Sequence, residues 1–166
     1  MNYKQMHEAM ESLNEWKLIT SFTVGGFDYL GFSRNNPHKL LIISGQKDTV
    51  FDCKDKSITE AVIAIDEKEF VALCDLLPDE EIPIAGSYGG SISHKTKQGE
   101  RVEIINHDPH VICGKELIYQ KIDFIERNGN RTTIFDSYPA YVFGFSCDGN
   151  YFVLADDGAL WILKRK

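Results

Sequence analysis

Short runs of β-branched and aromatic residues, separated by turn-forming residues, constrain the fold of this chain more than any other feature. From Lys17 onward the runs are "KLITSFTV", "DYLGFS", "KLLIIS" and "TVFDC", and the segments "GG", "RNNPH" and "GQKD" separate them. Such runs are too short for most helices and are typical of β-strands joined by tight turns. The sequence therefore predicts a mainly β chain in which neighbouring strands pair antiparallel.

The two ends of the chain repeat one pattern. The tetrapeptide "LGFS" at 30–33 corresponds to "FGFS" at 143–146, and two further apolar runs follow each of them. This predicts two three-stranded meanders of similar design. The pattern is faintly similar to propeller blades of the WD or kelch type, but the "GH…WD" signature is absent. The chain is also long enough for only about three blades, whereas a closed propeller needs at least four, so we interpret the repeat as convergent hairpin patterning.

The N-terminal stretch has a helical rather than a strand period. Met6, Met10, Leu13 and Trp16 follow one another at steps of four and three, with polar residues between them. This is the apolar stripe of an amphipathic helix. We expect a helix over about residues 4–15 that packs on a sheet.

The segment "DEKEFVALCDLLP" predicts a second short helix, over about residues 67–76. Asp66 and Glu69 form a pair that resembles a capping box, and Pro78 would end the helix. The expected fold is thus α+β and mainly β: one curved, mostly antiparallel sheet or barrel-like meander with two short helices outside it. We expect residues 1–166 to form a single domain of ordinary size.

Composition and charge narrow the classes of function. The formal net charge is −7, which argues against a general nucleic-acid or anionic-membrane binder, because phosphate contacts need an excess of Lys and Arg. The N-terminal stretch lacks the continuous apolar segment of a secretory signal, and no apolar run approaches the ~20 residues that span a bilayer. We therefore expect a cytoplasmic protein with four reduced thiols, at Cys53, Cys74, Cys113 and Cys147.

The segment "HDPHVIC" gathers residue types that bind zinc. His107, His110 and Cys113 follow at three-residue intervals, and His94 is available as a fourth ligand. If "HVIC" is a strand, however, the side chains of His110 and Cys113 point to opposite faces of the sheet. We therefore expect no stoichiometric metal and no other cofactor, and regard His107, His110 and Cys113 as weak metal candidates.

A glycine-rich segment, "GSYGG" at 86–90, precedes Ser91, His94 and Lys95. Backbone N–H groups of such a loop can hold a small anion, but the Lys-Ser/Thr pair of a P-loop and its strand–loop–helix context are absent. A flexible loop explains the same residues. Nucleophilic catalysis by a cysteine finds no nucleophile elbow or papain-like signature here.

The leading hypothesis is a non-enzymatic cytoplasmic binding protein, such as an inhibitor or an immunity-type protein, that recognises a basic partner protein. Acidic residues would steer that partner and exposed aromatic residues would anchor it. The alternative is a small-molecule-binding or hydrolase-like protein with a site in the 86–95 and 107–113 loops. The sequence carries no signal for an oligomeric state. The expected binding residues are Asp79, Glu80, Glu81, Tyr88, Tyr138 and Tyr141.

Overall fold

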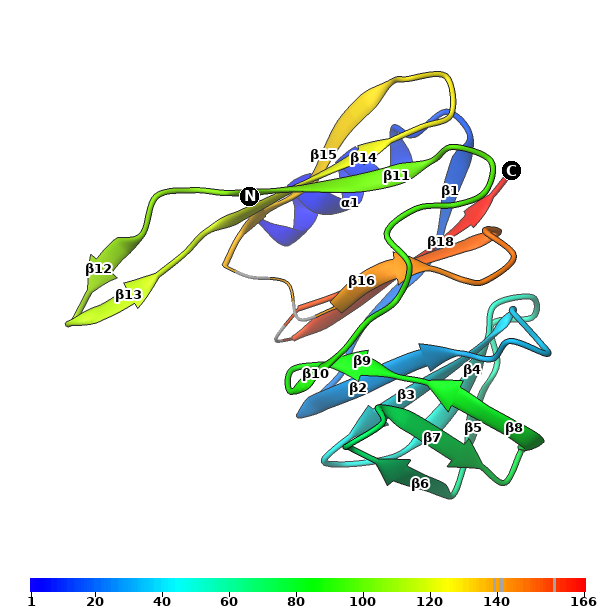
Figure 1. Cartoon of the computed structure of the whole chain (residues 1–166). Helices are drawn as coiled ribbons and strands as arrows, with labels where there is room; N and C mark the ends of the chain where they lie inside the picture. The colour runs from blue at the N-terminus through cyan, green and yellow to red at the C-terminus, as the bar shows by residue number, and fades with distance from the viewer. Residues whose placement is uncertain (139, 141, 157) are drawn as a thin grey trace.

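Four antiparallel sheets lie one on another in this protein, with a helix against the outermost of them (Figure 1). The computed structural model describes residues 1–138, 140, 142–156 and 158–166. Every strand pair in this part of the chain is antiparallel. Among the same residues, no helix has the length and apolar character needed to cross a bilayer.

We name each stacked sheet by one of its strands. The β18 sheet has the order β1-β18-β17-β16 and contains β1 (Trp16–Thr23), β16 (Val142–Phe145), β17 (Tyr151–Ala155) and β18 (Ala159–Arg165). The β3 sheet has the order β10-β9-β2-β3-β4-β5 and contains β2 (Phe27–Phe32), β3 (Lys39–Ser44), β4 (Thr49–Asp52), β5 (Ile58–Glu60), β9 (Ala85–Gly86) and β10 (Gly89–Gly90).

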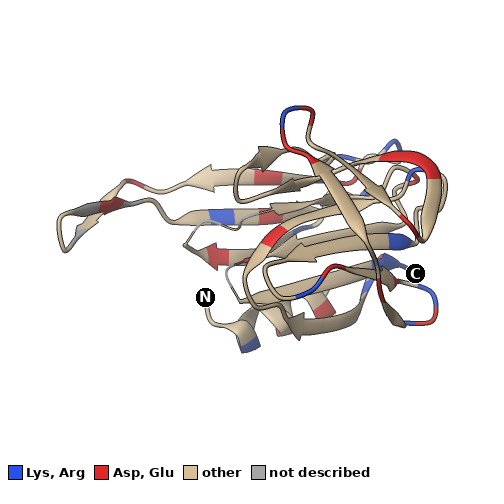
Figure 2. Ribbon diagram, turned by 90° about the horizontal axis from the view of Figure 1, so that it is seen from below, with Lys and Arg blue, Asp and Glu red and all other residues tan. Residues whose placement is uncertain are grey.

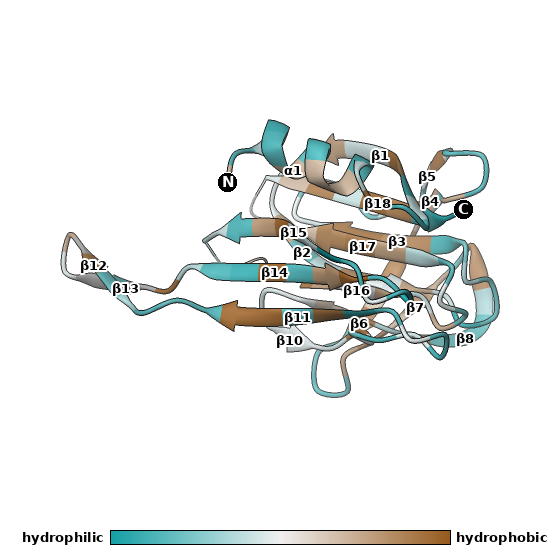
Figure 3. Cartoon of the chain, turned by 90° about the horizontal axis from the view of Figure 1, so that it is seen from above, coloured by the Kyte–Doolittle hydropathy of each residue, from teal (hydrophilic) through white to brown (hydrophobic). Residues whose placement is uncertain are grey.

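Two smaller sheets close the stack at its ends. The β14 sheet has the order β11-β14-β15 and contains β11 (Arg101–Asn106), β14 (Gln120–Ile125) and β15 (Arg131–Ser137). The β7 sheet has the order β6-β7-β8 and contains β6 (Ile63–Asp66), β7 (Val71–Cys74) and β8 (Leu77–Pro83). A separate hairpin, β12 (His110–Ile112) and β13 (Lys115–Leu117), extends away from the sheets (Figure 3).

Three apolar cores hold the layers together, and strand alternation assigns residues to them. In β17, Phe152 and Leu154 lie in the core shared with α1 and the β14 sheet, whereas Val153 lies in the core shared with the β3 sheet. In β3, Leu40 lies in that second core and Leu41 in a third core, against the β7 sheet. Both strands are therefore buried on both faces, which explains their continuous apolar sequences.

The amphipathic helix is confirmed as α1 (Tyr3–Glu11), which is shorter than the 4–15 expected. Asn2 caps it through a capping box with Gln5, a signal that the sequence itself contains. The four residues of the predicted apolar stripe are all at most 1% exposed, and they are Met6, Met10, Leu13 and Trp16. Two of them follow the helix, so the stripe extends through the connection into β1.

The two predicted meanders are confirmed as β2–β3–β4 and β16–β17–β18. Their shared "GF" has a common structural reason, because a Cβ on either glycine would collide with a crossing segment. It would lie 2.3 Å from the carbonyl oxygen of Pro83 at Gly31, and 2.7 Å from Cγ2 of Ile92 at Gly144. The repeated "GFS" therefore marks a place where the backbone is approached closely in both sheets.

The second predicted helix is wrong. Residues 67–76 instead contain the turn after β6 and all of β7, which pairs with β6 and β8. The Asp66 carboxylate accepts hydrogen bonds from the backbone N–H groups of Lys68 (2.9 Å) and Glu69 (3.2 Å), as it would at a helix N-cap, but here it closes a turn. The apolar residues then alternate as in a strand: Ala72 and Cys74 are buried, and Leu73 between them is exposed.

The prediction of one curved or barrel-like sheet is also wrong in its detail, because the sheets form a stack and do not close. A barrel wall buries one face, whereas β3 and β17 bury two, so layers are needed on both sides of them. Residues 79–83, "DEEIP", belong to β8, and the glycines of "GSYGG", for which a flexible loop was the expectation, belong to β9 and β10.

Candidate functional site

The net charge of the protein is concentrated in one segment. Residues 55–87 hold nine of the 25 acidic and two of the 18 basic residues, which is a net charge of −7. The remainder holds sixteen of each and is neutral. Because this segment forms β5, the β7 sheet and β9, the charge lies at the end of the stack opposite α1 (Figure 2).

Apolar side chains are exposed in the same region. Val62 is 75% exposed and Leu73, on the outer side of β7 opposite Ala64, is 54% exposed. Ile58 and Leu76 are exposed as well. We call the exposed surface of residues 55–87 the acidic face. It combines exposed apolar side chains with exposed carboxylates, a composition typical of protein interfaces.

The three predicted acidic residues on β8 have different roles. Glu80 turns inward and supports the β2–β3 turn: its carboxylate accepts hydrogen bonds from the hydroxyl of Ser33 and from the backbone N–H groups of Arg34 (3.1 Å) and Asn35 (3.2 Å). Asp79 and Glu81 are exposed. The structure therefore separates Glu80, a structural residue, from its two neighbours on the acidic face.

Replacing Glu80 with glutamine is expected to lower the free energy of unfolding by about 1–3 kcal/mol, because one amide cannot accept from all three donors and Ser33 is buried. The matched variant Glu81→Gln should change it by less than about 0.5 kcal/mol. Urea unfolding of both variants measures the difference. Equal stabilities would show that the Glu80 contacts do not hold the turn.

Other acidic residues on this face also have structural partners. Asp75 accepts a hydrogen bond from the backbone N–H of Val62 (3.0 Å), and Glu67 accepts one from the hydroxyl of Tyr29 (3.2 Å). Glu69 and Glu81 are exposed and, within the described part of the chain, their side chains make no hydrogen bond or ion pair. Substituting these two residues therefore changes the charge of the face without breaking a hydrogen bond or an ion pair.

The predicted tyrosines lie in separate places. Tyr88, 71% exposed at the β9–β10 turn, contacts the ring of Tyr29 with a centroid distance of 5.9 Å. Tyr138 follows β15 and stacks on Tyr119 at 4.7 Å. Tyr141 lies outside the described residues. The structure thus places Tyr88 beside the acidic face and gives Tyr138 a different neighbourhood.

Tyr119 lines a hollow of about 600 Å³ together with His107 and His110. Nε2 of His107 lies 3.3 Å from the Asp136 carboxylate, and the hydrogen bond with Tyr138 raises the pKa of Tyr119. Cys113 lies in the turn between β12 and β13, with a φ of 50°, and does not line the hollow. Among the described residues, no group of three or more His, Cys, Asp or Glu is placed to hold a metal.

The 86–95 segment lines a different hollow, of about 260 Å³, which shares no residue with the first. His94 stacks on Phe143 at 4.6 Å, and the loss of solvent there lowers the pKa of His94. Burial raises the pKa of Cys53 to about 12 and also raises the pKa of Cys147. The pKa of neither thiol is lowered, as activation of a nucleophile would require, and the two loops line separate hollows.

Sequence reasoning missed the exposed apolar residues of the acidic face, including Val62 and Leu73. Two signals were available: the net charge summed by segment, and the strand alternation in "VALC". Comparison with protein-family models and with curated proteins finds no match for this sequence. The functional proposal therefore rests on the surface and its chemistry.

Proposed function

We propose that this protein is a non-enzymatic cytoplasmic binding protein that recognises a basic partner protein through the acidic face. The observation that carries the proposal is the coincidence of the whole net charge with exposed apolar side chains in residues 55–87. Carboxylates steer a basic surface toward the face over roughly a Debye length, about 10 Å at 0.1 M ionic strength. The apolar side chains then supply contact area that water leaves on binding.

An inhibitor or immunity-type protein acts in this manner, by covering a basic surface of its target. Such a role needs a rigid scaffold with complementary charge and no reactive group. The raised thiol pKa values and the separation of the two loops support this choice over the hydrolase-like alternative. The separation of the two loops also favours a binding surface on a packed sheet over a site formed by loops.

Reversing two charges on the acidic face is expected to weaken capture of the partner from the native cell extract by at least about tenfold, because steering and close-range attraction are both lost. The test variant is Glu69→Lys/Glu81→Lys, which leaves the structural contacts of Glu80 and Asp75 intact. The matched control is Asp108→Lys/Glu116→Lys, which reverses two exposed charges elsewhere.

The captured partner is then used to measure association rates with purified protein at rising salt concentration. For the wild type and the control the rate should fall steeply with salt, and for the test variant it should be slower and less dependent on salt. Equal capture by both double variants, or a partner whose contact surface is acidic, would contradict the proposal.

A further inference from the structure

A polar hollow of about 500 Å³ lies where turns of the two meanders meet. The β2–β3 turn, the residues after β4, the β16–β17 turn and the end of β18 all contribute to its wall. This size is within the range of small-molecule sites in proteins. The charged and titratable residues that line it are His38, Lys54, Asp148, Tyr151, Lys164, Arg165 and Lys166.

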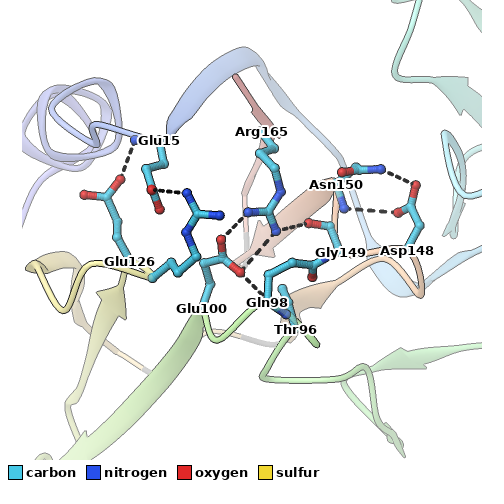
Figure 4. Close-up of polar contacts among 10 residues, drawn as sticks. Glu15, Thr96, Gln98, Glu100, Glu126, Asp148, Gly149, Asn150 and Arg165 are labelled. Carbon is cyan, nitrogen blue, oxygen red and sulfur yellow. Dashed lines mark hydrogen bonds and ion pairs between the residues drawn. The ribbon is translucent and has the colours of Figure 1, made fainter.

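The wall is cationic in an acidic protein: four basic side chains face one carboxylate. That carboxylate, on Asp148, is occupied within its own turn, where it accepts from the Ser146 hydroxyl (2.6 Å) and from the backbone (3.1 Å) and side-chain (2.8 Å) N–H groups of Asn150. Figure 4 shows Asp148 directed toward Asn150. Asp148 keeps its negative charge and Arg165 is paired with Glu100, so Lys54, Lys164 and Lys166 leave an excess of positive charge in the wall.

Arg165 is a positioning residue for this wall. Its guanidinium forms two bonds with the buried carboxylate of Glu100 and donates a third hydrogen bond to the carbonyl of Gly149 (2.7 Å), so it ties β18 to the β16–β17 turn (Figure 4). Lys164 precedes it in the same strand. Fixing Arg165 therefore holds the adjacent strand and turn in a constant relation.

The remaining cations of the wall are not paired with any carboxylate among the residues that the structure describes. In the described part of the chain, neither Lys54 nor Lys164 forms an ion pair. Lys17 lies directly opposite Lys164 in the β1–β18 pairing, and like charges at such positions repel. Lys166 donates to two backbone carbonyls, of Leu13 and Asn14, which leaves its charge in place.

The pKa of His38 is affected by the same charged residues. Its pKa is lowered, first by burial and then by the charges of Lys54 and Lys39, and the nearby carboxylates of Asp52 and Asp148 oppose these effects. An anion bound among these groups would stabilise the imidazolium form.

We propose that this hollow binds a small phosphorylated molecule, with Lys54 and Lys164 as the principal contacts. A phosphoryl group carries nearly two negative charges and three acceptor oxygens, so it matches several converging cations better than a single carboxylate does. Lysine is a common phosphate ligand in proteins, acting as a point charge. The site is distinct from the acidic face and does not depend on the function proposed above.

The experiment titrates the full-length protein with pyrophosphate, measured by calorimetry and by the NMR signals of His38. Removing two charges in Lys54→Gln/Lys164→Gln should weaken pyrophosphate binding by at least about tenfold. The matched control Lys68→Gln/Lys95→Gln removes two exposed lysines elsewhere and should change binding by less than about twofold. Saturation with pyrophosphate should also raise the pKa of His38 in the wild type.

Circular dichroism verifies that both double variants fold, which is expected because all four lysines are exposed. Citrate at matched ionic strength is the carboxylate comparison and should bind more weakly than pyrophosphate. An equal or tighter affinity for citrate would overturn the choice of phosphate. Absence of pyrophosphate binding, or an equal loss in the control variant, would overturn the site itself.

Discussion

Replacing Arg165 with methionine is expected to lower the free energy of unfolding by about 3–5 kcal/mol, the effect of leaving a buried charge without its partner. Glu100 is fully buried and receives two bonds from this guanidinium and one from the hydroxyl of Thr96. The guanidinium also lies over the ring of Trp16, 4.9 Å from its centroid. Methionine keeps part of the apolar contact, so the loss measures mainly the ion pair.

Two further variants isolate the charge effect in urea unfolding. Glu100→Gln/Arg165→Met removes both charges and should recover more than half of the lost stability, because no uncompensated ion remains buried. Arg101→Met breaks an exposed pair with Glu103 and should lower stability by less than about 1 kcal/mol. If Arg165→Met is no more destabilising than Arg101→Met, the buried pair is not a major support of the fold.

The pH dependence of this pair has a definite sign. Burial alone would raise the pKa of Glu100, but the hydrogen bonds from Arg165 and Thr96 outweigh it, and the pKa is lowered from its ordinary 4.5. The stabilisation is therefore present above pH 4.5 and is lost as the pH falls through the lower, folded-state pKa. The difference in unfolding free energy between the wild type and Arg165→Met should become smaller as the pH falls below the folded-state pKa of Glu100.

Replacing Phe124 with alanine is expected to lower the free energy of unfolding by about 3–5 kcal/mol, because it opens a cavity between two layers. This buried ring of the β14 sheet lies against Trp16 (5.4 Å between centroids), Phe145 (5.6 Å) and Phe152 (5.2 Å) of the β18 sheet. The four rings belong to the core that joins these sheets, which also contains Phe135, Phe143 and Trp161.

Two controls accompany this variant. Phe124→Leu retains most of the buried volume and should be less destabilising than Phe124→Ala. Tyr88→Ala removes an exposed ring and should change stability by less than about 0.5 kcal/mol. Urea unfolding, followed by the fluorescence of Trp16 and Trp161, measures all three. A loss for Phe124→Ala no larger than that for Tyr88→Ala would contradict the packing between the sheets.

Local sequence patterns were sufficient to predict the elements in which the order of apolar residues agrees with the burial of their side chains. The stripe that begins with Met6 and Met10 predicted α1, and the repeated "GFS" with its two following runs predicted both meanders. The apolar residues of α1 follow the period of its buried face, and the continuous apolar runs of β3 and β17 match strands that are buried on both faces. The turn residues between the runs then restrict each meander to short connections.

The segment 67–76 was predicted wrongly because its local signal is shared by two structures. An aspartate that accepts from the N–H groups two and three residues later begins a helix or closes a turn. What decides between them is the environment. A strand at β7 pairs with β6 and β8 and places Ala72 and Cys74 in the core against the β3 sheet.

The candidate face shows the same division. The sequence by itself determined that the chain is β-rich, that its ends form meanders, and that its net charge lies in residues 55–87, since these follow from the order and type of residues alone. Only the tertiary structure decided that Glu80 supports a turn while Glu81 is exposed, and that Lys54 and Lys164 line one hollow. The reason is physical: period and charge are properties of neighbours along the chain, whereas contacts between turns of different sheets depend on how the layers stack.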